Sequence, residues 1–322
     1  MVDLSRSNDG GVATVVSPAT PMLGVYLPDT PPALGPLQVF ERVSEAYCAI
    51  ASFYWSWGLG HPGEAARGVR TILAAGRLAL LTWEPWRLPP AGADPATWPG
   101  NHRYRPRHIA EGAFDDDIDE WARALAGVGD TVLLRPMHEM NGNWYPWCGT
   151  ASANTPRDFI DAWRRLHGRF QAAGATRVQW VWCPYARSVP DEPHNAIERY
   201  FPGEEFVDWM AIDGYNWGDA RPWSRWQEFR EIFDAPYRTL TRLGSRPILI
   251  AELGCDESGG DKSAWMTRAW AELLTHFPRV RGVVWFDTVK ECDWRVTSST
   301  ESLNAFRRSW ASARAPAGAP LT

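Results

Sequence analysis

The chain has 322 residues, of which 45% are hydrophobic and 22% are charged, and its formal net charge is -5. This length suits one large α/β domain or two ordinary domains. A mildly acidic chain without a basic run gives no sign of binding nucleic acid or an anionic membrane surface, so we expect a neutral substrate.

The first 21 residues mix Ser, Asp, Gly, Thr and Pro, and they contain no apolar run of the length found in a signal peptide. We expect residues 1–21 to form a flexible lead-in and residues 313–322 a flexible tail, on either side of one domain over residues 22–312. No stretch approaches the ~20 apolar residues of a membrane span. The expected compartment is extracellular if a signal has been removed and cytoplasmic otherwise.

From Leu23 onward, short apolar runs alternate with amphipathic stretches in a strand-then-helix rhythm. Eight runs are expected to form strands: 23–26, 47–54, 78–83, 131–135, 178–183, 207–213, 247–252 and 282–287. The stretches 114–125, 156–173 and 263–277 have apolar residues at the spacing of a buried helical face. Eight such units in one domain predict a (β/α)8 TIM barrel, whose chemistry lies at the C-terminal ends of the strands. A doubly wound sheet is the alternative, but no glycine-rich phosphate turn follows the first run.

The fourth run continues into residues 131–148, which read TVLLRPMHEMNGNWYPWC. Strand alternation places Leu133, Arg135, Met137 and Glu139 on one face, so charged groups reach the inward side near the end of the strand. A lone glutamate at a strand end is most often solvated or salt-bridged. Here large aromatic rings stand beside the polar groups. That combination suits a pyranose site, where a ring stacks on the sugar and polar groups bind its hydroxyls.

Metal sites and disulfides find little support in the sequence. The adjacent positions of His138 and Glu139 are poor spacing for metal ligands, and no HExxH motif follows. The five cysteines are widely scattered and include no CxxC pair, so neither a zinc site nor a disulfide framework is indicated. We therefore expect no metal and no cofactor.

The seventh run supplies a second carboxylate. It reads Pro-Ile-Leu-Ile-Ala-Glu, and alternation sends Ile248, Ile250 and Glu252 to the inward side. Seven of the eight predicted strand ends carry polar or aromatic groups: Tyr26; Tyr54, Trp55 and Trp57; Trp83, Glu84 and Trp86; His138 and Glu139; Asp213, Tyr215 and Trp217; Glu252; Trp285 and Asp287. The chain has 20 tryptophans; core packing accounts for many of them, and the remainder suggests a ring-lined cleft at these strand ends.

Four separated motifs occur in a fixed order along the chain. The fourth run ends in HExxGxW, the sixth contains Asp-x-Tyr, the seventh ends in Ile-Ala-Glu and the eighth contains Val-Val-Trp. Together they resemble glycoside hydrolase family 26, the family of β-mannanases and some β-1,3-1,4-glucanases. The resemblance spans roughly Leu23 to Ser309.

The resemblance implies a role for each matching residue. It makes Glu139 the acid/base and Glu252 the nucleophile, with His138 helping to hold the nucleophile and the sugar at the cleavage point. The remaining expected supporting or substrate-binding residues are Asp213 and Tyr215 beside the nucleophile, Trp285 as the platform beneath the sugar, Trp144 on the leaving-group side, and Arg135, Asn141, Trp147 and Trp83. Alternation agrees for Trp285, since it places this residue on the same face as Val283 and Asp287.

The physics of two carboxylates flanking one bond sets the expected mechanism. If Glu139 and Glu252 lie about 5 Å apart, the nucleophile reaches the anomeric carbon and configuration is retained, whereas ~6.5–9.5 Å leaves room for a water and inversion. Ionised Glu252 would raise the pKa of Glu139, while Tyr215, His138 or Arg135 would keep Glu252 charged. We expect double displacement through a glycosyl-enzyme intermediate.

The expected substrate is an oligo- or polysaccharide bound by a monomeric protein. Mannanases of the family commonly show His-Glu-Asn-x-Gly followed by Trp-Phe-Trp-Trp, whereas this chain reads HEMNGNWYPW and later KECDWR, which looks more like the β-1,3-1,4-glucanase branch. β-1,3-1,4-Glucan is therefore favoured over β-1,4-mannan. The alternatives are a catalytically inactive, carbohydrate-binding barrel and a metal-dependent barrel hydrolase.

Overall fold

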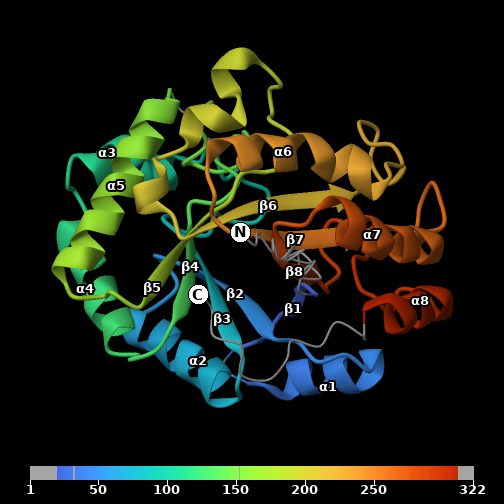
Figure 1. The fold of residues 1–322 in the computed structure, drawn as a ribbon. Helices are drawn as coiled ribbons and strands as arrows, with labels where there is room; N and C mark the ends of the chain where they lie inside the picture. The colour runs from blue at the N-terminus through green and yellow to red at the C-terminus, as the bar shows by residue number, and fades with distance from the viewer. Residues whose placement is uncertain (1–19, 32, 152, 311–322) are drawn as a thin grey trace, which may run out of the picture.

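Eight parallel strands close into a barrel, each hydrogen-bonded to its neighbours in sequence and β1 to β8 (Figure 1). The computed structural model describes residues 20–31, 33–151 and 153–310. The strands are β1 (Met22–Tyr26), β2 (Ile50–Ser56), β3 (Leu78–Glu84), β4 (Val132–Pro136), β5 (Val178–Trp182), β6 (Trp209–Asn216), β7 (Ile248–Cys255) and β8 (Val280–Phe286). The predicted TIM barrel is confirmed.

The helices form a ring around the barrel (Figure 1). They are α1 (Gly35–Ser44), α2 (Pro62–Ala74), α3 (Pro106–Ala110), α4 (Asp115–Ala126), α5 (Pro156–Ala172), α6 (Phe229–Leu243), α7 (Lys262–His276) and α8 (Thr300–Trp310). Both α3 and α4 follow β3, whereas the described chain between β5 and β6 forms only short 3-10 turns. The predicted lead-in and tail lie outside the described residues, apart from residues 20 and 21.

The local sequence explains where helix α5 begins and which face it buries. Pro156 occupies the first turn, and the side chains of Thr155 and Asp158 cap each other's backbone N–H groups. The helix then buries Phe159, Ala162, Trp163, Leu166 and Phe170, which recur at helical spacing. None of the helices in the described part of the chain combines the length and apolar character that a membrane crossing needs.

The apolar core has two layers, one inside the barrel and one between the strands and the surrounding helices. The interior cluster consists of strand residues and of Cys183, directly after β5; the strand residues include Ile50, Leu80, Leu133, Ala211, Leu249 and Val284. A larger cluster joins the outward strand faces to the helices. Gly24 of β1 leaves room inside, because a Cβ there would meet the Ile50 Cβ at 2.8 Å. Above this interior layer, the C-terminal strand ends bring polar groups to the mouth of the barrel.

Candidate active site

The carboxylate of Glu252, on β7, is held by three donors from three other strands. Its Oε1 accepts from Arg135 Nη2 at 2.6 Å and from the Tyr54 hydroxyl, and its Oε2 accepts from the Tyr215 hydroxyl. Glu252 is only 5% exposed, and burial alone would raise the pKa of its carboxyl. The Arg135 guanidinium and the two tyrosine hydroxyls outweigh burial and lower that pKa to about 2. Glu252 is therefore ionised.

Arg135, on β4, is the cation at the centre of this arrangement. Its Nη1 donates to both oxygens of Asp213, at 2.7 and 2.8 Å, while Nε and Nη2 donate to Thr82 Oγ1 at 2.9 and 2.7 Å. The guanidinium is completely buried and bridges the carboxylates of Asp213 and Glu252. A buried cation must be paired with opposite charges and hydrogen-bonded, and Arg135 meets both conditions.

Glu252 faces the mouth because β7 carries an extra residue. Ile212 of β6 pairs with Ile250, but Asp213 pairs with Glu252, so the register slips by one residue. Leu249 and Ala251 face the interior cluster, while Ile248 and Ile250 belong to the outer core. The expectation that Ile248, Ile250 and Glu252 share one face by alternation is therefore wrong. A β-bulge at Ala251–Glu252 returns the carboxylate to the inside.

Glu139 lies on the loop after β4, where the chain leaves strand geometry. Met137 and Glu139 have positive φ values of 49° and 54°, which are strained for residues with side chains. The Glu139 N–H donates to Cys183 O at 2.7 Å, which fixes this turn against β5. The predicted inward position of Met137 is wrong, because this side chain packs in the outer core.

The carboxyl of Glu139 has the opposite environment to that of Glu252. It is 6% exposed, and its Oε2 accepts one hydrogen bond, from Trp144 Nε1 at 2.7 Å. Burial first, and then the charge of Glu252, raise the pKa of Glu139 to about 8. Glu139 thus holds a proton at neutral pH while Glu252 does not.

His138 lies beside Glu252 as a neutral ring. Burial, followed by the charge of Arg135, lowers its pKa well below the ordinary value. Its ring contacts Tyr54 and Tyr145, with centroids 5.8 and 4.9 Å apart. Its Nδ1 is buried without a hydrogen-bond partner among the described residues, so a polar atom of a bound ligand can pair with it.

The ligand atoms of His138, Asp213 and Glu252 lie within 4.8 Å of one another, a spacing that a metal ion can bridge. The Arg135 guanidinium, however, already occupies both oxygens of Asp213 and one oxygen of Glu252. A divalent cation in the same place would meet that positive charge at close range. The site therefore suits carboxylates paired with Arg135 and does not suit a bound metal ion.

Trp147 and Asn141 support the loop that carries Glu139. Trp147 is fully buried, donates from Nε1 to His138 O at 2.7 Å, and stacks on Tyr145 with centroids 4.4 Å apart. The Asn141 amide donates to Tyr185 O at 2.9 Å and accepts from Tyr185 N at 2.8 Å. Asn141 therefore ties this loop to the segment that follows β5.

Trp285 and Trp83 lie in the core, and their expected contact with substrate is wrong. Trp285 is completely buried, lies 5.8 Å from Phe306 and 5.9 Å from Trp310 of α8, and donates from Nε1 to Trp294 O at 2.9 Å. Trp83 is likewise completely buried, against Trp57, Trp121 and Phe170. The residues around Trp83 and Trp285 are buried on both faces of their strands, so burial there does not reveal which face is inward.

The residue beside Trp285 takes the inward position instead. Phe286 stacks on Tyr26 with ring centroids 4.5 Å apart and meets Tyr215 edge-on at 5.7 Å. Alternation counted along β8 from Val284, which faces the interior cluster, would have found it.

Tyr54 and Glu84 stand at predicted strand ends, but the sequence motifs assign no role to either residue. Tyr54 donates to the nucleophile candidate Glu252. The Glu84 carboxyl is buried on β3, accepts from Trp86 Nε1 at 3.1 Å, and burial raises its pKa to about 7. Glu84 is thus a third acid near the mouth, and Trp86 is the one donor to its carboxyl among the residues that the structure describes.

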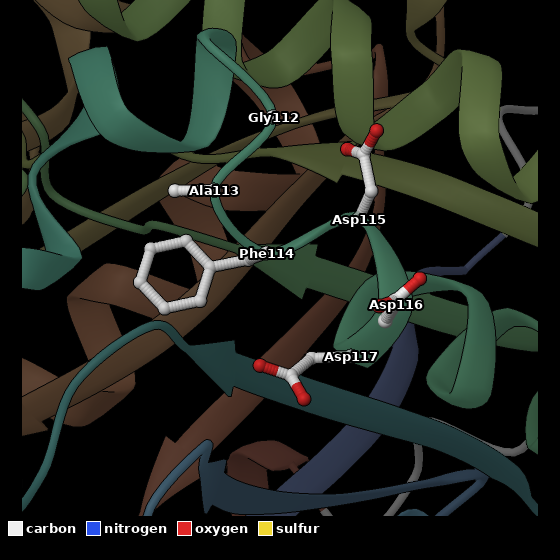
Figure 2. Close-up of a pocket in the computed structure, with 6 residues that line it drawn as sticks. All are labelled: Gly112, Ala113, Phe114, Asp115, Asp116 and Asp117. Carbon is white, nitrogen blue, oxygen red and sulfur yellow. The ribbon is translucent and has the colours of Figure 1, made fainter.

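A separate hollow at the start of α4 has acidic walls but a structural role. Figure 2 shows its lining residues, Gly112, Ala113, Phe114, Asp115, Asp116 and Asp117. The three aspartates point in different directions, and Asp115 pairs with Arg165 at 2.6 Å. The side chains do not converge on a point, so the chemistry is placed at the strand ends.

Comparison with known sequences agrees with this geometry. The sequence model "Glycosyl hydrolase family 26" matches residues 109–268. The chain is 37% identical over 235 residues to "Endoglucanase H" of Acetivibrio thermocellus, covering 72% of this chain and 24% of that protein. It is 27% identical over 202 residues to "Mannan endo-1,4-beta-mannosidase A and B" of Caldalkalibacillus mannanilyticus, covering 61% and 34%. The chain thus spans about a quarter to a third of the length of these relatives.

Solved structures share the fold at low sequence identity. The catalytic domain of a Bacillus sp. GH26 endo-β-1,4-mannanase superposes with a TM-score of 0.67 at 15% identity, covering 92% of this chain and 87% of that chain. A GH26 β-mannanase from Bacteroides ovatus gives 0.63 at 20% identity, covering 91% and 89%. At such identities the likeness establishes the barrel.

Proposed function

Because the chain belongs to glycosyl hydrolase family 26, we propose that it hydrolyses β-linked glycans with retention of configuration at the anomeric carbon. One observation carries the proposal: two buried carboxyls at the barrel mouth have pKa values displaced in opposite directions. Glu139 has a pKa of about 8 and Glu252 of about 2. Such a pair supplies one proton donor and one permanent anion.

The first half of the reaction uses both groups at once. Glu252 attacks the anomeric carbon and forms a glycosyl ester, while Glu139 transfers its proton to the departing glycosidic oxygen. Tyr54, Tyr215 and Arg135 hold the Glu252 carboxylate in position for this attack. In the second half, ionised Glu139 takes a proton from water, the water oxygen bonds to the anomeric carbon, and Glu252 leaves as the carboxylate.

The low pKa of Glu252 favours retention over inversion. An inverting enzyme needs a general base, and a base works best when its pKa lies near the working pH. A carboxylate with a pKa of about 2 is a weak base, yet it remains an anion available for direct attack. Its three hydrogen bonds also fix its orientation for direct attack on the anomeric carbon.

We assign the substrate class as β-1,3-1,4-glucan in preference to β-1,4-mannan. The relative called an endoglucanase is 37% identical to this chain, and the one called a mannosidase is 27% identical. The sequence around Glu139 also departs from the mannanase pattern, as described above. Both substrates present a β-linked pyranose to Glu139 and Glu252, and the two sugars differ only at C2, so the roles of the two carboxyls do not depend on this choice.

The experiment is a substrate panel followed by proton NMR. Mixed-linkage glucan, β-1,4-mannan and β-1,3-xylan are each incubated with the protein, with Glu252→Ala as the inactive control, and new reducing ends are measured. We expect release from mixed-linkage glucan above the others, and the β-anomer as the first product seen by NMR. First appearance of the α-anomer would contradict retention. Absence of release from all three would contradict the hydrolase.

A further inference from the structure

Trp223, on the loop between β6 and α6, is unusually exposed. It shows 70% of its surface, more than any other exposed large hydrophobic residue in the described part of the chain. Its ring contacts that of Trp217, with centroids 5.1 Å apart. A bare indole supported by a second indole is a typical surface for binding an apolar ring face.

These two rings are connected to the acid at the centre of the site. Trp217 Nε1 donates to the Tyr185 hydroxyl at 3.2 Å, and the Tyr185 ring meets Trp144 edge-on, with centroids 5.2 Å apart. Trp144 in turn donates to Glu139. An unbroken series of aromatic side chains thus runs from Glu139 to the surface. Since Glu139 protonates the departing oxygen, this series begins on the leaving-group side of the cleaved bond.

The loop that carries Trp223 is fixed on both sides of the ring. Ser224 Oγ donates to Gly218 O at 2.7 Å, and Asn216 Oδ1 accepts from the N–H groups of Gly218 and Gln227 at 3.2 and 3.0 Å. Gly218 has a φ of +51°, and a Cβ there would lie 1.8 Å from Ser258 O, so the loop presses against the chain after β7. A preorganised ring loses little freedom when a ligand stacks on it.

Trp217 is also supported from below. Its ring meets Trp294 nearly at right angles, with centroids 4.9 Å apart, and Trp294 packs on Tyr215 at 4.8 Å. Tyr215 donates to Glu252. The two rings are therefore part of the same packed unit as the proposed nucleophile.

We propose that Trp217 and Trp223 form a stacking platform for the pyranose rings of the glycan downstream of the cleaved bond. This inference rests on the proposed function and extends it. The occupant is a neutral β-linked sugar chain whose axial C–H groups face the indoles and whose hydroxyls stay in water. A platform that binds the leaving-group chain favours cleavage within a long chain over removal of single sugars from an end.

The test compares two substrates of the same enzyme. One is mixed-linkage glucan; the other is an activated aryl glycoside of a β-glucodisaccharide, which has no sugar downstream of the cleaved bond. For Trp223→Ala, we expect the ratio of kcat/KM on glucan to kcat/KM on the aryl glycoside to fall about tenfold. Trp223→Tyr, which keeps a ring, should retain most of the ratio. A ratio unchanged in Trp223→Ala would overturn the platform.

Tyr47→Ala is the matched control, because Tyr47 is also a partly exposed aromatic residue but precedes β2 at the N-terminal end of the barrel strands. The ratio should not change in this variant, and an equal fall there would overturn the assignment to Trp223. The melting temperatures of wild type and variants are measured to exclude unfolding as the cause of a changed ratio. If the wild type cleaves neither substrate, the proposed function fails. The platform is then judged by calorimetric binding of mixed-linkage oligosaccharide, where equal affinity of wild type and Trp223→Ala would overturn it.

Discussion

Arg135 Nη2 lies 2.6 Å from Glu252 Oε1, and the same guanidinium holds both oxygens of Asp213. This contact makes the two buried carboxyls of the site unequal. Arg135 gives Glu252 a hydrogen-bonded positive partner that offsets burial, whereas among the described residues the Glu139 carboxyl accepts a hydrogen bond from the Trp144 indole N–H alone and feels the charge of Arg135 without contact. The division of roles between acid and nucleophile therefore depends on which carboxyl the arginine touches.

Arg135→Lys should lower kcat/KM about 10²-fold, since a lysine ammonium cannot form the planar set of hydrogen bonds by which the guanidinium contacts Asp213, Thr82 and Glu252 together. The pKa of Glu252 should rise toward its ordinary value, so the acid limb of the kcat/KM–pH profile should move to higher pH. The profile on an activated aryl glycoside measures both effects. An acid limb that stays in place would contradict the role of Arg135 in ionising Glu252.

The raised pKa of Glu139 predicts a basic limb in activity. Because Glu139 must donate a proton, kcat/KM on a natural glucan should fall above a pH of about 8. Glu139→Gln cannot titrate, so its residual activity on an activated aryl glycoside should lack this limb. The check sets the kcat/KM–pH profile of the wild type on glucan beside that of Glu139→Gln on the aryl glycoside; a basic limb that persists in Glu139→Gln belongs to another group.

The same pKa predicts how stability depends on pH. Folded Glu139 keeps its proton up to a pH of about 8, whereas in the unfolded chain it loses the proton near its ordinary value of 4.5. Between these values the folded state binds more protons, so the contribution of Glu139 to the free energy of unfolding decreases as pH rises. Urea unfolding of wild type and Glu139→Gln across this window should show a smaller decrease for the variant. Parallel curves would contradict the raised pKa.

The matched variants Trp285→Phe and Trp144→Phe distinguish a tryptophan of the core from a tryptophan of the active site. Trp285→Phe removes a buried hydrogen bond and leaves a cavity against α8, so it should cost about 2 kcal/mol of unfolding free energy while kcat/KM stays within about threefold. Trp144→Phe removes the donor to Glu139 and should lower kcat/KM with little change in stability. The reverse pattern would contradict the placement of both residues.

The barrel could be predicted from the sequence because its signal is repeated. Eight apolar runs separated by amphipathic stretches leave few other arrangements, and the observed strands begin and end within a few residues of the expected ones. The glutamates of the site could also be located, since each follows an apolar run. Position along a strand is a strong signal because a barrel brings all C-terminal strand ends to one mouth.

The direction of individual side chains could not be predicted in the same way. Simple alternation fails at Glu252, where a bulge adds a residue, and at Met137, where the strand has ended and φ is positive. At Trp285 alternation holds, but the inward face has to be chosen, and the residues around Trp285 are buried on both faces of β8 and do not mark it. These are local backbone and packing features that only the three-dimensional structure reveals.

Azide rescue of two alanine variants tests the central assignment most directly. Activated aryl β-glycosides need no proton on the leaving group, so Glu139→Ala should form the glycosyl-enzyme and then transfer the sugar to azide, giving a β-glycosyl azide. Glu252→Ala lacks the nucleophile, and azide entering its place should give an α-glycosyl azide. We predict these two anomers, one from each variant, by NMR of the products. The opposite anomers, or no azide adduct from either variant, would contradict the assignment of Glu139 as acid/base and Glu252 as nucleophile.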